Sequence, residues 1–302
     1  MFFYLIFLWR LDKNERESFK NVFRHFLWGA FGAVILGVIF SFFFTSTIQM
    51  FITNENILAF TGAVFIAPVV EETTKGIYLL RTSQKNYFDN ITDGLVYGGA
   101  IGLGFGMTEN LMYFIQYDET FIQWATLVFT RSVFSAVMHA IATATFGAFL
   151  AKAKFTNSGK KYVYPVIGLI LAMSFHFIWN LTLSLEFTYL VGIIFMIFLI
   201  VSFLIIFNLS IKEEEKLISN ELFEELNLMG FVSGENKIGN IFQRRIIFFE
   251  NKIKNKQFLN FATKLAFRKF QARNSSGKQQ EIYLSEIEIQ RENIKKLIEK
   301  KS

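Results

Sequence analysis

Cysteine is absent from all 302 residues of the chain. Disulfides and thiolate metal sites are therefore excluded, and any metal ion must be held by His, Asp, Glu or water. Histidine is nearly as scarce, with three residues in the whole chain, and proline occurs only twice. The side chains able to bind a metal or to transfer a proton near neutral pH are thus few enough to consider one by one.

Charge is missing from long stretches of the chain, which hold runs of apolar residues instead; the hydrophobic content is 52%, with 39 Phe. Long apolar runs without amphipathic stripes predict an all-α, polytopic transmembrane bundle. We expect about six full spans, because six runs approach or exceed the ~20 residues that a spanning helix needs. These runs are Phe26 to Met50, Ile57 to Leu80, Ile91 to Ile115, Phe121 to Ala151, Val163 to Ser184 and Tyr189 to Leu209.

The expected organisation is an N-terminal segment (1–25), a transmembrane domain (26–210) and a helical tail (211–302). The N-terminal segment begins with an apolar run, Met1 to Trp9, which is too short to span a bilayer and lacks the features of a secretory signal. The tail holds 18 Lys and Arg against 13 Asp and Glu, a net charge of +5. Such a tail beside a membrane favours contact with anionic lipid head groups, and we do not expect nucleic acid as a partner.

Lys and Arg are absent from every second connector between the expected spans. Residues 10–25 hold five of them, and the turns after Leu80 and Ala151 are also basic, whereas residues 51–56, 116–120 and 185–188 hold none. Cytoplasmic loops carry the excess of Lys and Arg. The pattern predicts a multi-pass protein of the cell membrane whose carboxyl-terminal tail is cytoplasmic.

Ionisable residues nevertheless interrupt the second apolar run, at Glu71, Glu72 and Lys75. A charge at the middle of a bilayer costs roughly 2.5 to 3.5 kcal/mol even on lenient scales, so such residues usually face a bundle interior and mark a site. The lysine is three and four residues from the two glutamates and can neutralise only part of their charge. A self-satisfied buried ion cluster is the structural alternative.

Three further runs carry polar residues. In the run Ile91 to Ile115, a glycine-rich stretch is followed by Glu109 and Asn110. The run Phe121 to Ala151 holds Arg131 and His139, and the run Val163 to Ser184 holds His176 with Asn180 one turn later. Glycines at spacings of two and four allow another helix to approach closely. Each residue alone is explained as well by packing and hydrogen bonding, but together they favour one shared site.

Depth supports a shared site. At 1.5 Å per residue, Glu71 lies ~14 Å from the cytoplasmic end of its span, His139 ~17 Å and His176 ~20 Å. Glu109 lies at a similar level if its helix enters the apolar core near Val96. We therefore expect these residues to converge on one water-filled cavity that opens toward the cytoplasmic half or the middle of the bilayer.

Two chemistries suit such a cavity. His139, His176 and a glutamate can hold Zn²⁺ with an open position for water, while a second glutamate acts as general base. Alternatively, a desolvated glutamate activates water directly, while a histidine and Asn180 polarise a carbonyl. Both lead to amide hydrolysis. Two other classes of function also remain open: an ion- or proton-coupled transporter, although no internal repeat relates two halves of the chain, and a catalytically silent scaffold.

Four motifs taken in order resemble the PrsW family of intramembrane proteases, which is distantly related to the prenyl-protein (CAAX) endopeptidases. These motifs are Glu71-Glu72-x-x-Lys75, Phe105-x-x-x-Glu109-Asn110, His139 and His176-x-x-x-Asn180. The resemblance extends over about residues 10 to 273. It departs at the start, where family members open with a complete hydrophobic span and this chain has only Met1 to Trp9.

The resemblance implies an intramembrane endopeptidase that performs site-1 cleavage of a single-pass membrane protein, such as an anti-sigma factor. It leaves open whether zinc or a metal-free glutamate mechanism is used. The residues implied as catalytic are Glu71, Glu72, Glu109, His139, His176 and Asn180. If a metal is bound, the expected ligands are Glu72, Glu109, His139 and His176.

Overall fold

A computed structural model describes residues 1–116, 120–156, 158–228 and 252–299. Every regular element within these ranges is helical, which confirms the all-α prediction. The elements are α1 (Phe2–Leu11), α2 (Phe19–Leu27), η1 (Trp28–Ala33), α3 (Val34–Gln49), α4 (Glu55–Thr61), η2 (Gly62–Ile66), α5 (Ala67–Ser83), α6 (Ile91–Gln116), α7 (Phe121–Thr130), η3 (Arg131–Ser135), α8 (Ala136–Lys154), α9 (Lys160–Ser184), η4 (Glu186–Thr188), α10 (Tyr189–Leu228), α11 (Lys252–Arg273) and α12 (Lys278–Glu299).

The chain divides into two compact units. The first comprises Met1–Asp12, Glu17–Lys154 and Ser158–Phe207 and holds the apolar helices. The second comprises mainly the chain from Asn208 onward, where α11 and α12 pack through an apolar core that includes Phe258 and Tyr283. The domain boundary expected at residue 211 stays a prediction.

Five helices of the described residues are long and apolar enough to cross a membrane, one fewer than the six expected. They are Phe19–Gln49, Glu55–Ser83, Phe121–Lys154, Lys160–Ser184 and Tyr189–Glu221. The remaining expected span, Ile91 to Ile115, is helical, as α6, but falls outside this group. Its residues from Thr92 to Gly106 are all buried by other helices. Because lipid does not touch this stretch, it tolerates many glycines, which lower its mean hydropathy.

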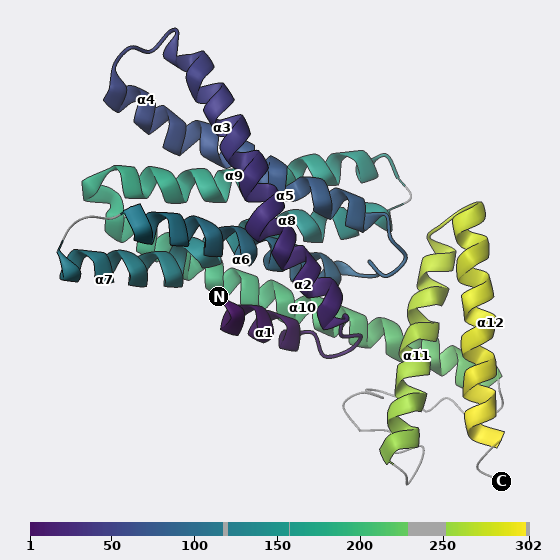
Figure 1. The fold of residues 1–302 in the computed structure, drawn as a ribbon. Coiled ribbons are helices and arrows are strands. Elements are labelled where there is room, and N and C mark those ends of the chain that lie inside the picture. The colour runs from purple at the N-terminus through teal and green to yellow at the C-terminus, as the bar shows by residue number, and fades with distance from the viewer. Residues whose placement is uncertain (117–119, 157, 229–251, 300–302) are drawn as a thin grey trace. The chain divides into compact units, whose positions relative to one another are not determined.

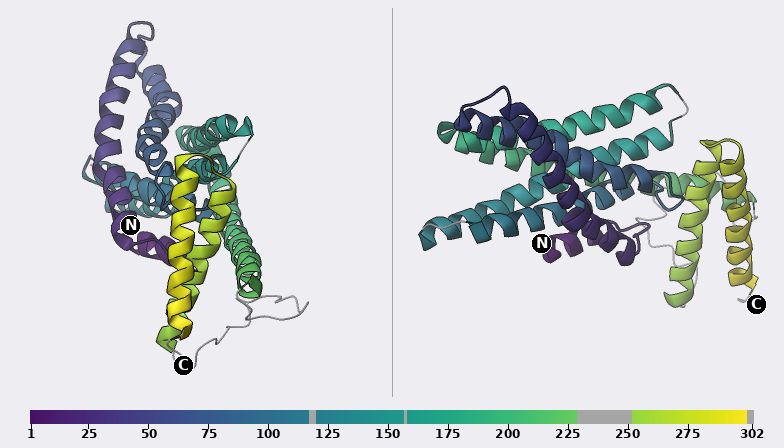
Figure 2. Two further views of the ribbon diagram at one scale, coloured as in Figure 1. Left: turned by 90° about the vertical axis from the view of Figure 1, so that its right-hand side faces the viewer. Right: turned by 45° about the horizontal axis from the view of Figure 1, so that its top comes forward.

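Helix α6 lies at the centre of the first unit, with α8 and then α9 beside it, while Phe19–Gln49 crosses them obliquely (Figure 1, Figure 2). Its contact with α8 is made through glycines. A Cβ on Gly102 would overlap the carbonyl of His139, and one on Gly98 would overlap the carbonyl of Thr143. The expected close approach at the glycine stretch is therefore present, and it brings the backbone of His139 directly against α6.

Three of the long helices contain one wider, π-helical turn: η1, η2 and η3. The turn η2 immediately precedes Pro68, near the start of α5. Proline lacks the N–H that an α-helix needs and crowds the carbonyl four residues earlier, so a wider turn relieves the strain without breaking the helix. Glu71 and Glu72 lie one turn after Pro68 on α5.

Candidate active site

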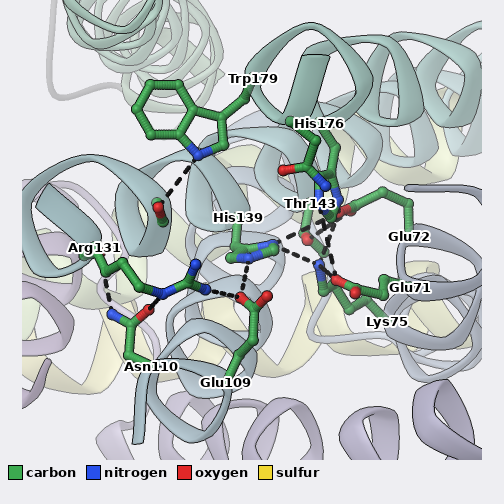
Figure 3. Close-up of polar contacts among 12 residues, drawn as sticks. Glu71, Glu72, Lys75, Glu109, Asn110, Arg131, His139, Thr143, His176 and Trp179 are labelled. Atoms are coloured by element: carbon green, nitrogen blue, oxygen red, sulfur yellow. Dashed lines mark hydrogen bonds and ion pairs between the residues drawn. The ribbon is translucent and has the colours of Figure 1, made fainter. Parts of the chain in front are cut away.

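Helix α5 presents Glu71, Glu72 and Lys75 to α8 and α9 (Figure 3). Lys75 Nζ lies 2.7 Å from Glu72 Oε1 and 3.6 Å from Glu71 Oε2. The ammonium is fully buried, and so is the Glu72 carboxylate apart from 1% of its surface. Two adjacent residues on a helix point about 100° apart, so one lysine reaches both carboxylates but bonds only one of them closely.

The Glu72 carboxylate joins three helices. It accepts a 3.2 Å hydrogen bond from Thr143 Oγ1 of α8, and its Oε1 lies 3.0 Å from His176 Nδ1 of α9. With the bond from Lys75, both oxygens are satisfied. Such a buried carboxylate is tolerated because it is paired and hydrogen-bonded.

The two imidazoles of the site face each other. The ring centroids of His139 and His176 are 4.8 Å apart, with the ring planes nearly perpendicular. His139 Nε2 lies 2.7 Å from Glu109 Oε2, and its Nδ1 lies 2.8 Å from Lys75 Nζ. Helices α5, α6, α8 and α9 thus each contribute to one connected polar cluster, as Figure 3 shows. The five residues expected to converge are brought together.

Asn180 lies one turn beyond His176 on α9. Its Nδ2 donates a 2.8 Å hydrogen bond to the carbonyl of Ala63. The side chain is therefore in the same neighbourhood as the cluster but contributes to the wall of an adjoining cavity rather than to the carboxylate network.

That cavity has a volume of about 220 Å³. It lies where Glu109 of α6, Arg131 and His139 of the long helix Phe121–Lys154, and Asn180 of α9 meet. Its level in the bilayer, expected in the cytoplasmic half or the middle, stays a prediction. On the other side of the cluster, Lys75, Glu72 and Thr143 fill the space with their mutual bonds. The lining residues are Ala63, Glu109, Tyr113, Arg131, Ser135, His139, Trp179, Asn180, Leu183 and Ser184.

The cluster contains a group suited to a metal ion. Glu71, His139 and His176 each offer one ligand atom, and these atoms lie within 4.8 Å of one another. Within the described residues, Glu71 Oε2 is buried and accepts no hydrogen bond. An oxygen in that position is satisfied by a metal ion or an ordered water. Two imidazoles, one carboxylate and an open position match a catalytic zinc site.

The ring nitrogens distinguish the two histidines. His176 bonds Glu72 through Nδ1, which leaves Nε2 for a ligand, and that nitrogen lies 3.9 Å from Glu71 Oε2. His139 has partners on both nitrogens, so it must release either Lys75 or Glu109 to bind a metal. This group has Glu71 as its carboxylate, whereas the expected ligands were Glu72, Glu109, His139 and His176, and the ligand set stays a prediction. Glu72 and Glu109 each lie against one ring nitrogen, of His176 and His139 respectively, on the outer side of the group. Carboxylates in such outer positions orient ligand imidazoles in many metal sites.

One polar residue of the cluster was not singled out from the sequence. Thr143, at four residues from His139, shares its helical face, and this spacing was the available signal. Asn110 was noted beside Glu109, but its partner Arg131 lies on another helix and 21 positions away. No sequence spacing reveals a pairing of that kind.

A model of the PrsW family, described as intramembrane metalloproteases, matches residues 17–207. The chain belongs to this family. The matched region contains the five residues expected to converge and Asn180, and the expected enzyme class, an intramembrane protease, is confirmed. The family resemblance read from four motifs therefore holds over most of the first compact unit.

Several curated relatives carry the name Protease PrsW. The one from Clostridioides difficile (strain 630) is 25% identical over 208 residues, which cover 68% of this chain and 82% of the relative. The one from Oceanobacillus iheyensis is 34% identical over 127 residues, covering 41% and 55%. The one from Bacillus subtilis (strain 168) is 26% identical over 177 residues, covering 57% and 73%. No solved structure matches the chain.

Proposed function

We propose that this intramembrane protease hydrolyses a peptide bond in a single-pass membrane protein, and that its substrate is an anti-sigma factor or a similar regulator. The observation that carries the proposal is the convergence of Glu71, His139 and His176 in one group beside a cavity. The family resemblance supplies the substrate class.

In this proposal Glu71, His139 and His176 hold a zinc ion, which supplies a bound water that ionises near neutral pH. Glu72 accepts a hydrogen bond from the Nδ1–H of His176. This bond keeps the lone pair of His176 Nε2 directed toward Glu71 and His139. Glu109 does the same for His139 through Nε2. Nδ1 would then be the nitrogen of His139 available to the zinc, and Lys75 would have to give up its contact with that atom.

Glu109 has a second role in the proposal. Its Oε2 is held by His139 and Arg131, and the residue also lines the cavity. Its other oxygen, Oε1, accepts the proton of the attacking water and later passes it to the leaving amine. Asn180, at the cavity wall, polarises the scissile carbonyl once its bond to Ala63 is exchanged for the substrate.

The tail from Ile211 onward is proposed to be cytoplasmic, because the Lys- and Arg-bearing connectors fall on its side. A protease added to intact cells should spare the tail, whereas the same protease should digest it in inverted vesicles. Digestion in intact cells would reverse the topology.

The function is tested by reconstituting the purified protein with a candidate single-pass substrate in vesicles. A shortened fragment should form, and Glu71→Ala, Glu72→Ala and His176→Ala should each abolish it while the protein still folds. Asn180→Ala should weaken cleavage less, because a polarising group contributes rate whereas a ligand or its orienting partner is required. Glu55→Ala, which changes an exposed carboxylate at the start of the same long helix, is the matched control.

Normal cleavage by both Glu71→Ala and Glu72→Ala would refute the mechanism. Retained cellular function of Glu71→Gln without any fragment would favour a silent scaffold instead. Ion flux into the vesicles that is lost in Glu71→Gln would favour a transporter.

A further inference from the structure

Arg131 is a cation of the membrane domain whose side chain is only 11% exposed. It is the first residue of η3, eight positions before His139 on the same long helix. Its guanidinium spans two neighbouring residues of α6: Nε donates a 3.1 Å hydrogen bond to Asn110 Oδ1, and Nη2 lies 3.0 Å from Glu109 Oε2.

Asn110 fixes the arginine in return. Its Nδ2 donates a 3.0 Å hydrogen bond to the backbone carbonyl of Arg131, so the two residues exchange bonds in both directions. The flat face of the guanidinium lies against the ring of Tyr113, with Cζ 3.5 Å from the ring centroid. A planar cation held at one edge by an amide and on one face by an aromatic ring has little freedom to turn.

The held guanidinium acts on a single oxygen. Oε2 of Glu109 receives both Arg131 Nη2, at 3.0 Å, and His139 Nε2, at 2.7 Å. The orientation of the His139 imidazole therefore depends on the position of the Glu109 carboxylate. The contact with Arg131 fixes that position. Lys75 cannot replace this contact, because it binds His139 through the other nitrogen.

We propose that Arg131 is a positioning residue for the proteolytic site: locked by Asn110 and Tyr113, it fixes Glu109 and, through Glu109, the ring of His139. The inference rests on the proposed function for its kinetic consequence, but the geometric part stands without it. A lysine at position 131 keeps the positive charge but is a flexible point charge without the planar fork. An Arg131→Lys variant therefore keeps a positive charge beside Glu109 but no longer fixes the position of its carboxylate.

The kinetic test compares Arg131→Lys, Arg131→Ala and Asn110→Ala with Arg81→Ala, a control at an exposed arginine near the end of α5. A misplacement of about 1 Å can cost about 10²-fold in rate, so kcat should fall by about that factor in both Arg131 variants and less in Asn110→Ala, with KM changed less than kcat. Because Arg131 lines the 220 Å³ cavity, added methylguanidinium should restore part of kcat in Arg131→Ala. It should restore nothing in His139→Ala.

The spectroscopic test needs no activity. The chain has only three histidines, so ¹⁵N-histidine labelling gives three pairs of ring-nitrogen signals, assigned with His25→Gln and His176→Gln. Arg131→Lys should shift the signals of His139 and leave those of His25 unchanged. If the wild-type protein cleaves no substrate but this shift appears, the proposed function fails and the positioning role stands. Normal kcat in a folded Arg131→Lys, or an unchanged His139 signal, would overturn the inference. If Arg131→Ala does not fold, Arg131→Lys and Asn110→Ala still decide it.

Discussion

Lys75 Nζ donates a 2.7 Å hydrogen bond to Oε1 of Glu72, one turn earlier on α5, and the side chains of the two residues are 0% and 1% exposed. The pair is an ion pair sealed within the protein. Its favourable energy depends on both partners being present, because removing one leaves the other buried without its nearest counter-charge.

Lys75→Met should therefore destabilise the membrane domain strongly, by about 3 to 5 kcal/mol, the usual effect of removing one partner of a buried pair. Thermal unfolding in detergent micelles measures this. Lys160→Met changes an exposed lysine at the start of α9 and should leave the midpoint nearly unchanged. Equal midpoints for the two variants would show that Glu72 does not depend on Lys75.

Gly102→Ala should separate α6 from α8. The added methyl group would meet the backbone carbonyl of His139, which cannot move aside as a flexible side chain can. Overpacking of this kind costs about 1 to 3 kcal/mol, and the shift of His139 should lower proteolysis beyond the loss of stability. Gly159→Ala is the control, since nothing lies within 4 Å of a Cβ at that position. Unfolding midpoints and fragment yield are measured together.

Metal content should depend on His176 but not on His25. We expect the purified protein to retain zinc, and His176→Gln and Glu71→Gln to lose it, because both contribute to the ligand group. His25 bonds Asn21 and Thr82 outside that group, so His25→Gln should keep the metal. Elemental analysis by mass spectrometry gives the answer without an activity assay. A metal-free protein that still cleaves would favour direct activation of water by a glutamate.

Stability should fall as pH rises through neutrality, because of Glu17. Burial, together with the negative Asp89 and Asp12, raises the pKa of this carboxyl to about 7. A carboxyl with a folded-state pKa above its unfolded-state value of 4.5 stabilises the fold fully below pH 4.5, and this contribution is lost as pH rises through about 7. Unfolding midpoints from pH 5 to pH 8 should thus decline more steeply in the wild type than in Glu17→Gln. Parallel curves would contradict the assignment, and Glu55→Gln is the exposed control.

Much of the fold was predictable because a bilayer requires long apolar helices, and long apolar runs can be recognised directly in the sequence. The exception is α6, whose apolar character is diluted by glycine since other helices cover it. The composition of Ile91 to Ile115 correctly predicts a helix. It does not reveal that other helices bury the residues from Thr92 to Gly106.

The candidate site was predictable to the level of which residues meet. Charged residues within apolar runs are costly, and this cost indicated Glu71, Glu72 and Glu109. What the sequence could not provide is the direction of each bond. Neighbouring glutamates differ in role according to a rotation of about 100°, and the choice between two imidazole nitrogens depends on partners from other helices.

The wider turn Arg131–Ser135 ties Arg131 and His139 to one another through the register of a single helix. A π-helical turn holds one residue more than the α-helical turn it replaces, and one residue corresponds to a rotation of about 100°. If the residues of this turn adopted ordinary α-helical geometry with none removed, the two halves of the helix would turn by about 100° relative to each other. Either the guanidinium would leave Glu109 or the imidazole would leave His176, although no residue of the polar cluster had been changed.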